Sequence, residues 1–319
     1  MPTGINRRSF VKGALLASAA GALNLRADEA KAPAEPKPGL FPAPEGDGNI
    51  GNLWVSRLLL GGNLLTHYTH SRDLAYVYKL AEHYNTEAKI LETLALAEQH
   101  GVNTLSVHTV PAILATLQKH RKLGGKMQWI ICPTTPVDAP GDGFANQVKE
   151  LADMGCDAVY LWGVHADKLV GRAELIAKAV RIIKDHKLPA GVGAHDLRVV
   201  TECEKNKVDN DFYIKTFHHH HYPSAPRPDQ VVNPYNEVPG YWCSDPNAVI
   251  ETMKNVQKPW IAFKVMAAGA IPPQSAFQYA FDSGADHVLA GMFDFEIAAD
   301  ADIVKSVLGS VKRTRPWHS

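Results

Sequence analysis

The stretch that decides the fold is residues 211–223, DFYIKTFHHHHYP, in which an apolar segment holding one lysine runs into four histidines. The pattern predicts a single β-strand over Phe212–His218. Successive side chains of a strand point to opposite faces, so Lys215 is expected on the face opposite Phe212 and Ile214.

A second strand repeats this arrangement. Residues 260–266 read WIAFKVM, with Ile261 and Phe263 on an apolar face and Lys264 on the opposite one. If the two strands are neighbours in a parallel barrel and their apolar faces meet the surrounding helices, Lys264 and Lys215 point together into the barrel mouth. Two ammonium groups in a semi-enclosed site repel each other and lose solvation, and both effects lower a lysine pKa. A lysine of this kind acts as a nucleophile or a base at neutral pH.

Around these two strands, the whole chain alternates eight short strands with eight helices. The helices carry apolar residues at three- and four-residue spacing, and several helix-to-strand joints contain Gly or Pro. Strict alternation predicts an α/β fold, a single-domain (β/α)8 TIM barrel over residues 51–315. The predicted strands are 57–63, 104–109, 128–134, 158–163, 190–196, 212–218, 260–266 and 287–294. The predicted helices are 87–100, 110–121, 144–154, 172–186, 197–206, 246–256, 273–283 and 299–312.

The first 50 residues have the composition of an export signal and a spacer. Residues 6–12, NRRSFVK, contain a twin arginine, and the apolar run that follows is too short and too rich in Ala and Gly to span a membrane as a stable helix. This segment resembles a bacterial Tat signal. We therefore expect a signal peptide over 1–27, passage through the Tat export machinery, a periplasmic or otherwise exported protein, and no stable membrane span after processing. Residues 28–50 are Pro-rich and polar, which predicts a disordered linker.

The composition narrows the classes of partner. The 319 residues include 33 Lys and Arg and 33 Asp and Glu, so the formal net charge is zero. Nothing in this balance indicates nucleic acid or an anionic membrane as a partner. We expect a small-molecule substrate, and the composition is compatible with a homo-oligomer. The four cysteines form no CxxC pair, so a zinc ribbon is not indicated and buried thiols are expected.

The candidate site follows from the barrel. In this fold the catalytic groups lie at the C-terminal ends of the strands, and long loops from that face form the walls of the pocket. Two connections, 64–86 and 219–245, are long and rich in aromatic residues. The catalytic candidates at the rim are Lys215, Lys264, His195, His218 and Asp294. The substrate-binding candidates are Asn63, Tyr68, His108, Trp162, Arg227 and Trp242.

Two segments resemble Schiff-base aldolases of the deoxyribose-phosphate aldolase type. Residues 211–216, DFYIKT, are similar to the family's strand-six segment with its imine-forming lysine, and residues 263–271, FKVMAAGAI, to its strand-seven segment with a second lysine and a Gly-rich turn. The resemblance implies that Lys215 forms the imine and that Lys264 lowers its pKa. The chain departs from the family in the histidine run after strand six, and no segment matches the family's acid on strand four. As a whole, the chain resembles an uncharacterised family of Tat-exported TIM barrels.

The first functional hypothesis is a lysine-dependent lyase, aldolase or isomerase that acts on a small carbonyl or sugar-derived compound. Lys215 would attack the carbonyl or remove a proton, and Lys264 would tune it or hold an anionic group. His195 or His218 would shuttle protons, and Asp294 would orient or pair with these groups. This chemistry requires no cofactor.

Two alternatives remain open. One is a metal-dependent hydrolase, isomerase or lyase, because imidazole and carboxylate groups suit Zn, Mn or Fe, although two nearby lysines would oppose metal binding. The other is a non-catalytic periplasmic sugar-binding barrel, in which the aromatic loops would stack on sugar rings. The ligands expected for the metal reading are His108, His195, His218, His220 and Asp294.

Overall fold

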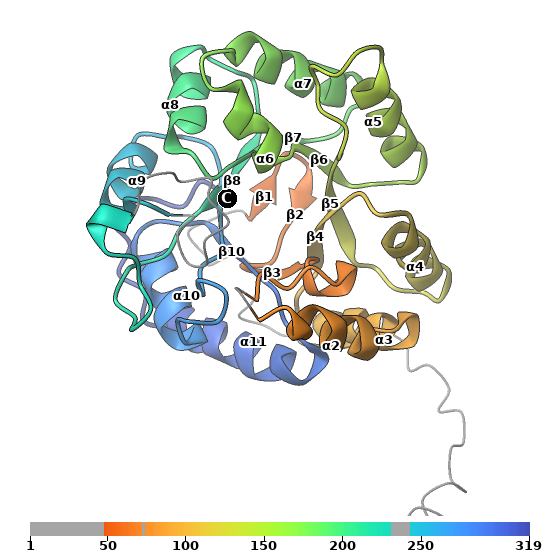
Figure 1. Cartoon of the computed structure of the whole chain (residues 1–319), viewed down its shortest axis with the longest axis vertical. Helices are drawn as coiled ribbons and strands as arrows, with labels where there is room; N and C mark the ends of the chain where they lie inside the picture. The colour runs from red at the N-terminus through yellow and green to blue at the C-terminus, as the bar shows by residue number, and fades with distance from the viewer. Residues whose placement is uncertain (1–47, 72–73, 231–242) are drawn as a thin grey trace, which may run out of the picture. The chain divides into compact units, whose positions relative to one another are not determined.

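The computed structural model describes residues 48–71, 74–230 and 243–319. Within these residues the chain forms a closed barrel of eight parallel strands in the order β10-β3-β4-β5-β6-β7-β8-β9, ringed by helices (Figure 1). This confirms the predicted (β/α)8 fold. The predicted signal peptide over 1–27 and most of the linker lie outside the described residues. None of the described helices combines the length and the apolar composition that a bilayer crossing needs.

Each barrel strand is shorter than its prediction, and two helices were not predicted. The helix α2 lies inside the long connection after the first barrel strand, and the one-turn helix α6 follows β6. The barrel strands are β3 (Leu58–Gly61), β4 (Thr104–His108), β5 (Gln128–Cys132), β6 (Ala158–Leu161), β7 (Ala190–Ala194), β8 (Phe212–Thr216), β9 (Trp260–Phe263) and β10 (His287–Ala290). The helices are α2 (Tyr76–Tyr84), α3 (Glu87–Gln99), α4 (Pro111–Lys122), α5 (Gly143–Asp153), α6 (Gly163–Ala166), α7 (Ala173–Asp185), α8 (Leu197–Lys205), α9 (Pro246–Met253), α10 (Pro273–Asp282) and α11 (Asp294–Leu308).

A short hairpin fills the N-terminal end of the barrel. Its strands, β1 (Asn49–Ile50) and β2 (Leu53–Trp54), pair antiparallel. Ile50 and Leu53 are buried in one cluster with inward-facing residues of the barrel strands, among them Phe212. Residues 49–50, expected at the end of the linker, therefore belong to the folded domain. Among the described residues, these apolar side chains close the N-terminal end of the barrel.

The strands β8 and β9 face the opposite way from the prediction. Ile214 and Ile261 lie in the cluster inside the barrel, whereas Tyr213 and Trp260 belong to the larger cluster between strands and helices. The Tyr213 hydroxyl donates to Glu204 Oε1 of α8 at 2.6 Å, which fixes its face as the outward one. Since strand faces alternate, Lys215 also points outward, toward the helices.

The glycines of β7 explain this orientation. A Cβ on Gly191 would lie 2.4 Å from the ring of Phe212, its partner on β8, so the bare backbone of β7 makes room for that ring inside the barrel. By these contacts, Gly191 and Gly193 point into the barrel. The error on β8 arose because both of its faces are apolar apart from Lys215, so alternation alone did not distinguish inside from outside.

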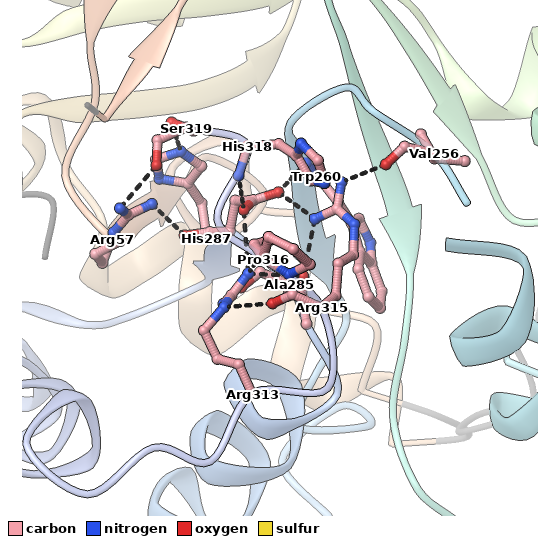
Figure 2. A network of polar contacts seen from close by, with 12 residues as sticks. Arg57, Val256, Trp260, Ala285, His287, Arg313, Arg315, Pro316, His318 and Ser319 are labelled. Carbon is pink, nitrogen blue, oxygen red and sulfur yellow. Dashed lines mark hydrogen bonds and ion pairs between the residues drawn. The ribbon is translucent and has the colours of Figure 1, made fainter. Parts of the chain in front are cut away.

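Hydrogen bonds hold the C-terminal segment against the N-terminal ends of the strands β9, β10 and β3 (Figure 2). The buried carboxylate of Asp286 accepts from Arg315 Nη1 at 2.6 Å, from Arg313 Nη2 at 3.2 Å and from the backbone N–H of Trp260 at 2.9 Å. Arg57 donates to the backbone oxygen of Ser319 at 2.9 Å. The folded domain therefore extends past residue 315, where the prediction ended it.

Candidate functional site

A cavity of about 1100 Å³ opens at the C-terminal end of the barrel. Its wall combines strand ends with the loops that follow them, and apolar groups alternate with a few polar ones. This is the location at which barrel enzymes place their active sites. The polar and aromatic lining residues are Asn63, Tyr68, Thr69, His70, Ser71, Ser106, His108, Tyr160, Trp162, Asp167, Lys168, His195, Phe263, Lys264, Phe293 and Glu296.

Six of the residues singled out from the sequence line this cavity. They come from five different strand ends or their loops, as expected for a site that draws on many strands. Their positions agree with the predicted rim, while the roles assigned to them stay predictions. These six are Asn63, Tyr68, His108, Trp162, His195 and Lys264.

Lys264 reaches the cavity by a different route from the one predicted. The strand β9 ends at Phe263, which points into the barrel, so alternation would turn the next residue outward. Lys264 instead has a left-handed backbone with φ of 58°, which takes the chain out of the strand. Ala267 and Ala268 are also left-handed, with φ of 47° and 57°. Non-glycine residues in this region cost of order 1 kcal/mol each, and such strain concentrates at functional sites.

His195 is held by a buried aspartate that the sequence did not single out. Asp167 Oδ2 lies 2.7 Å from His195 Nδ1, and Asp167 Oδ1 accepts from the backbone N–H groups of His195 and Asp196, both at 3.0 Å. With Nδ1–H donating to the carboxylate, Nε2 is the ring nitrogen available to a molecule in the cavity. Burial lowers the pKa of His195, and the Asp167 carboxylate only partly offsets this effect. His195 is therefore a neutral base at neutral pH.

His70 forms the opposite wall. Its Nε2 lies 3.0 Å from Asn63 Nδ2, and because an amide nitrogen donates, Nε2 accepts and the proton of the neutral ring is on Nδ1. Burial, together with the charges of Lys264, His195 and His108, lowers the pKa of His70 to about 3. The side chains of His70, His108, His195 and Lys264 all line the one cavity. Uncharged histidines let that space accommodate a single positive charge.

His108 completes the ring of imidazoles. Its ring stacks on Trp162 with centroids 5.9 Å apart and planes 6° from parallel. Burial lowers its pKa as well. Beneath this level, Ser106 and Tyr160 form the floor of the cavity. Neither Ser106 nor Tyr160 was proposed from the sequence as a site residue.

Lys215 is not part of the cavity. It is 1% exposed and lies on the outward face of β8, where Nζ donates to the carbonyl oxygen and to Oγ1 of Thr216, both at 2.9 Å. Burial lowers its pKa, as predicted in direction, but without the contribution of a second lysine that the prediction required. The expectation that Lys215 and Lys264 share one cavity is wrong, because the two strands present their apolar faces to the inside.

The histidine run also lies away from the cavity. His218 is buried with Nδ1 3.0 Å from the carbonyl oxygen of His219, and His220 Nε2 lies 2.5 Å from that of Cys243. His219 contacts Ser275 and the ring of Tyr279, both on α10. The run therefore packs on the helix layer, because the strand that precedes it directs its outward face there.

Three further candidates are also displaced or undescribed. Asp294 begins α11 rather than ending a strand, and it accepts from Tyr84 at 2.7 Å and from Lys89 at 3.0 Å, outside the cavity lining. Arg227 is exposed and lies 3.4 Å from Asp229. Trp242 lies outside the described residues. The expected pairing of Asp294 with the lysines is replaced by its pairing with Lys89.

The metal ligands expected from the sequence do not converge. His108 and His195 line the cavity, whereas His218, His220 and Asp294 lie elsewhere. Across residues 48–71, 74–230 and 243–319, no three His, Cys, Asp or Glu side chains gather closely enough to hold a metal ion. The five ligands expected for a metal-dependent enzyme therefore do not form one site among the described residues.

No protein-family model matches the chain, and no curated protein matches it in sequence. Solved structures do resemble it. A provisionally assigned aldo-keto reductase from Pseudomonas aeruginosa has a TM-score of 0.56 and 16% identity over 83% of this chain and 94% of that one. The apo form of Gox0644 has a TM-score of 0.51 and 10% identity over 81% and 90%. A 3-hexulose-6-phosphate synthase scores 0.44 with 15% identity over 69% and 94%. At these identities, the likeness shows a fold shared with TIM-barrel enzymes.

Proposed function

We propose that this protein is a lysine-dependent lyase, aldolase or isomerase that acts on a small carbonyl or sugar-derived compound, with Lys264 as the reacting amine. One observation supports the proposal above all others. Lys264 and the His195–Asp167 pair line the same cavity, where burial and the Lys264 charge lower the pKa of His195 and Asp167 partly offsets them. An amine and an oriented neutral base in one enclosed space are the parts that imine chemistry needs.

In the proposed reaction, the neutral amine of Lys264 adds to the substrate carbonyl carbon, and the resulting carbinolamine loses water to give an iminium ion. His195 Nε2 then takes a proton from the neighbouring carbon, or from a hydroxyl group whose loss of a proton breaks a carbon–carbon bond. The electron pair moves onto the iminium nitrogen and forms an enamine. Protonation and hydrolysis release the product and restore the amine.

The surrounding groups suit a cationic intermediate. Asp167 stabilises the imidazolium that forms when His195 accepts a proton, while the low pKa values of His70 and His108 keep those rings neutral. The iminium then shares the cavity with the Lys168 side chain and not with charged imidazoles at His70 and His108. The resemblance to Schiff-base aldolases implied an imine on Lys215, and we propose Lys264 instead because it lines the cavity and Lys215 does not.

Reductive trapping tests the proposal. The protein would be incubated with glyceraldehyde or dihydroxyacetone and sodium borohydride, and the modified peptide identified by mass spectrometry. We expect the adduct on Lys264 in the wild type and in Lys215→Met, and none in Lys264→Met. Lys215→Met is the matched control because it removes a buried lysine of the next strand that does not line the cavity. Absence of any adduct, or an adduct that persists in Lys264→Met, would reject the proposal.

We also propose that the enzyme is exported in a folded state through the Tat pathway. The support is the sequence of residues 6–12 alone, with its twin arginine. Replacing Arg7 and Arg8 by lysine in a bacterial host should leave the full-length chain in the cytoplasm, while the unchanged chain is recovered outside it in a shortened form. Equal export of both chains would contradict this part of the proposal.

A further inference from the structure

The floor of the cavity holds two hydroxyl groups that the proposed chemistry does not use. Ser106 and Tyr160 are 4% and 9% exposed, and both line the cavity from the inward faces of β4 and β6. The Ser106 hydroxyl is buried and makes no hydrogen bond of normal geometry among the described residues, although it lies close enough to the Tyr160 hydroxyl to affect the pKa of that group. A buried polar group left without a partner costs about 1–3 kcal/mol, so an orphan at the wall of a cavity calls for an explanation.

The floor carries no charge. Burial raises the pKa of the Tyr160 hydroxyl well above its usual value, so this group stays protonated and can donate a hydrogen bond. Burial also raises the pKa of the neighbouring Cys132 thiol to about 12, so the thiol is neutral too. A carboxylate or phosphate placed here would be desolvated without a compensating cation. The group that suits this floor is therefore a neutral oxygen, which can accept from Tyr160 and exchange a hydrogen bond with Ser106.

The strand geometry sets the length of the molecule that would reach this floor. His108 follows Ser106 by two residues on β4, and Trp162 follows Tyr160 in the same way at the end of β6. Two residues of a strand rise about 6–7 Å, which is about 5 Å along the barrel axis after the strand tilt. Once a hydrogen bond is allowed for, this distance matches a chain of roughly three or four carbons between the floor and the level of the imidazoles.

We propose that Ser106 and Tyr160 form an oxygen-binding subsite that selects a short hydroxycarbonyl compound, with its far hydroxyl group on the cavity floor and its carbonyl group at Lys264. The inference rests on the proposed function for the carbonyl end only. Gly193 supports access to this subsite, because a Cβ there would lie 3.1 Å from the Tyr160 ring and narrow the floor.

The test compares 4-hydroxybutanal with butanal at matched concentrations of the open-chain aldehyde, because 4-hydroxybutanal is largely a cyclic hemiacetal in water. Borohydride labelling of Lys264 would be measured against aldehyde concentration for the wild type, Ser106→Ala and Tyr160→Phe. We expect the wild type to reach half-maximal labelling at a concentration at least tenfold lower for 4-hydroxybutanal, since each hydrogen bond contributes a factor of about 2–10. The preference for 4-hydroxybutanal over butanal should shrink in each variant. Equal labelling by the two aldehydes, or a preference that survives both substitutions, would overturn the inference.

A second measurement does not depend on imine formation. A high-resolution crystal structure of the ligand-free protein should show an ordered water bridging Ser106 Oγ and Tyr160 Oη, and a dry floor would count against the subsite. Ser106→Ala should not lower the midpoint of urea unfolding, because it removes an unpaired hydroxyl. If no aldehyde labels Lys264 but the water is present, the proposed reaction fails while the oxygen subsite stands.

Discussion

The two ends of the barrel treat buried charge in opposite ways. At the N-terminal end, each charged group meets an opposite charge or a backbone oxygen, and Trp317 lies between Arg57 and Arg313, whose guanidinium carbons are 3.9 and 3.4 Å from its ring centroid. At the C-terminal end, burial lowers the pKa values of the histidines around a cavity, and of these His195 has a carboxylate partner, Asp167. The first arrangement stabilises the fold, and the second leaves groups available for a ligand.

Asp286 shows what the N-terminal end gains. It is 0% exposed, yet its carboxylate and the buried guanidinium of Arg315 satisfy each other, and Arg315 Nη2 also donates to the carbonyl oxygens of Val256 and Lys258 at 2.9 and 2.7 Å (Figure 2). This cluster joins the last residues of the chain to the starts of β9 and β10. The comparison predicts that substitutions at one end alter stability and at the other alter activity.

The largest effect is expected for Lys264→Met. If Lys264 is the nucleophile, turnover of a carbonyl substrate should fall by about 10⁴-fold, because the covalent route is lost. The free energy of unfolding should change by less than about 1 kcal/mol, since Met tolerates the same backbone as Lys and the side chain borders the cavity. Steady-state kinetics and urea unfolding of the same preparation measure both. If Lys264→Met lost stability but kept its turnover, the C-terminal end would serve stability and not activity, contrary to this comparison.

Asp286→Ala should produce the opposite pattern. Removing the carboxylate leaves Arg313 and Arg315 buried without their counter-charge, which costs about 3–5 kcal/mol of unfolding free energy. Turnover per folded molecule should be unchanged below the lowered melting temperature. Asp302→Ala, at an exposed position of α11, is the matched control and should alter neither quantity. A folded Asp286→Ala protein of wild-type stability would show that the cluster is dispensable.

Asp167→Asn tests whether the histidine is oriented as the site requires. An amide can donate to Nδ1 and so favour the wrong tautomer, which should lower turnover by about 10²-fold or more with little change in KM. Asp138→Asn, at an exposed carboxylate paired with Arg172, provides the control. A parallel loss in both variants would point to a general structural effect instead. The pH profile of turnover adds a second readout, because only Asp167→Asn should shift its acid limb.

Acid should weaken both ends through histidines that are buried in the neutral form. The pKa values of His70 and His287 are lowered to about 3 in the folded protein, in each case chiefly by burial. Below the unfolded value of about 6.5, the unfolded chain binds protons that the folded chain does not, so the unfolding free energy falls as the pH falls from 6.5 toward 3. Each histidine contributes a slope of up to about 1.4 kcal/mol per pH unit.

Single substitutions separate the two contributions. His70→Asn and His287→Asn should each reduce the slope of unfolding free energy against pH between pH 6 and 4 by about one proton, as measured by urea unfolding at several pH values. His287→Asn should also lower stability at pH 7, because it disturbs the hydrogen bonds to Ser56 and Ser319. An unchanged slope in His70→Asn would mean that its ring is already protonated in the folded protein.

The barrel could be predicted from sequence because the strand–helix alternation is repeated eight times. An error in the bounds or the orientation of one strand therefore does not change the predicted fold. The site could be predicted only where one face of a strand is polar. On β7, Gly193 and His195 define the inward face without ambiguity. On β8, both faces are apolar, and the decisive fact, the room that Gly191 makes for Phe212, lies on a different strand.

Two further features could not be read from local pattern. The position of Lys264 in the cavity depends on where β9 ends and on a left-handed backbone after it. The sequence KVMAAG does not predict that backbone, because two of the left-handed positions are Ala and not Gly. Asp167 lies on a short turn six residues after β6, so no strand periodicity identifies it. An acid after strand four was sought on grounds of resemblance, and only the fold shows that Asp167 contacts His195.

Exchange of the carbon-bound protons of hydroxyacetone in deuterated buffer, followed by proton NMR, tests the central claim most directly. The account predicts that the wild type exchanges an α-proton well above the buffer rate, that folded Asp286→Ala does so equally, and that Lys264→Met does not. Exchange in Lys264→Met at the wild-type rate, or none in the wild type, would contradict it.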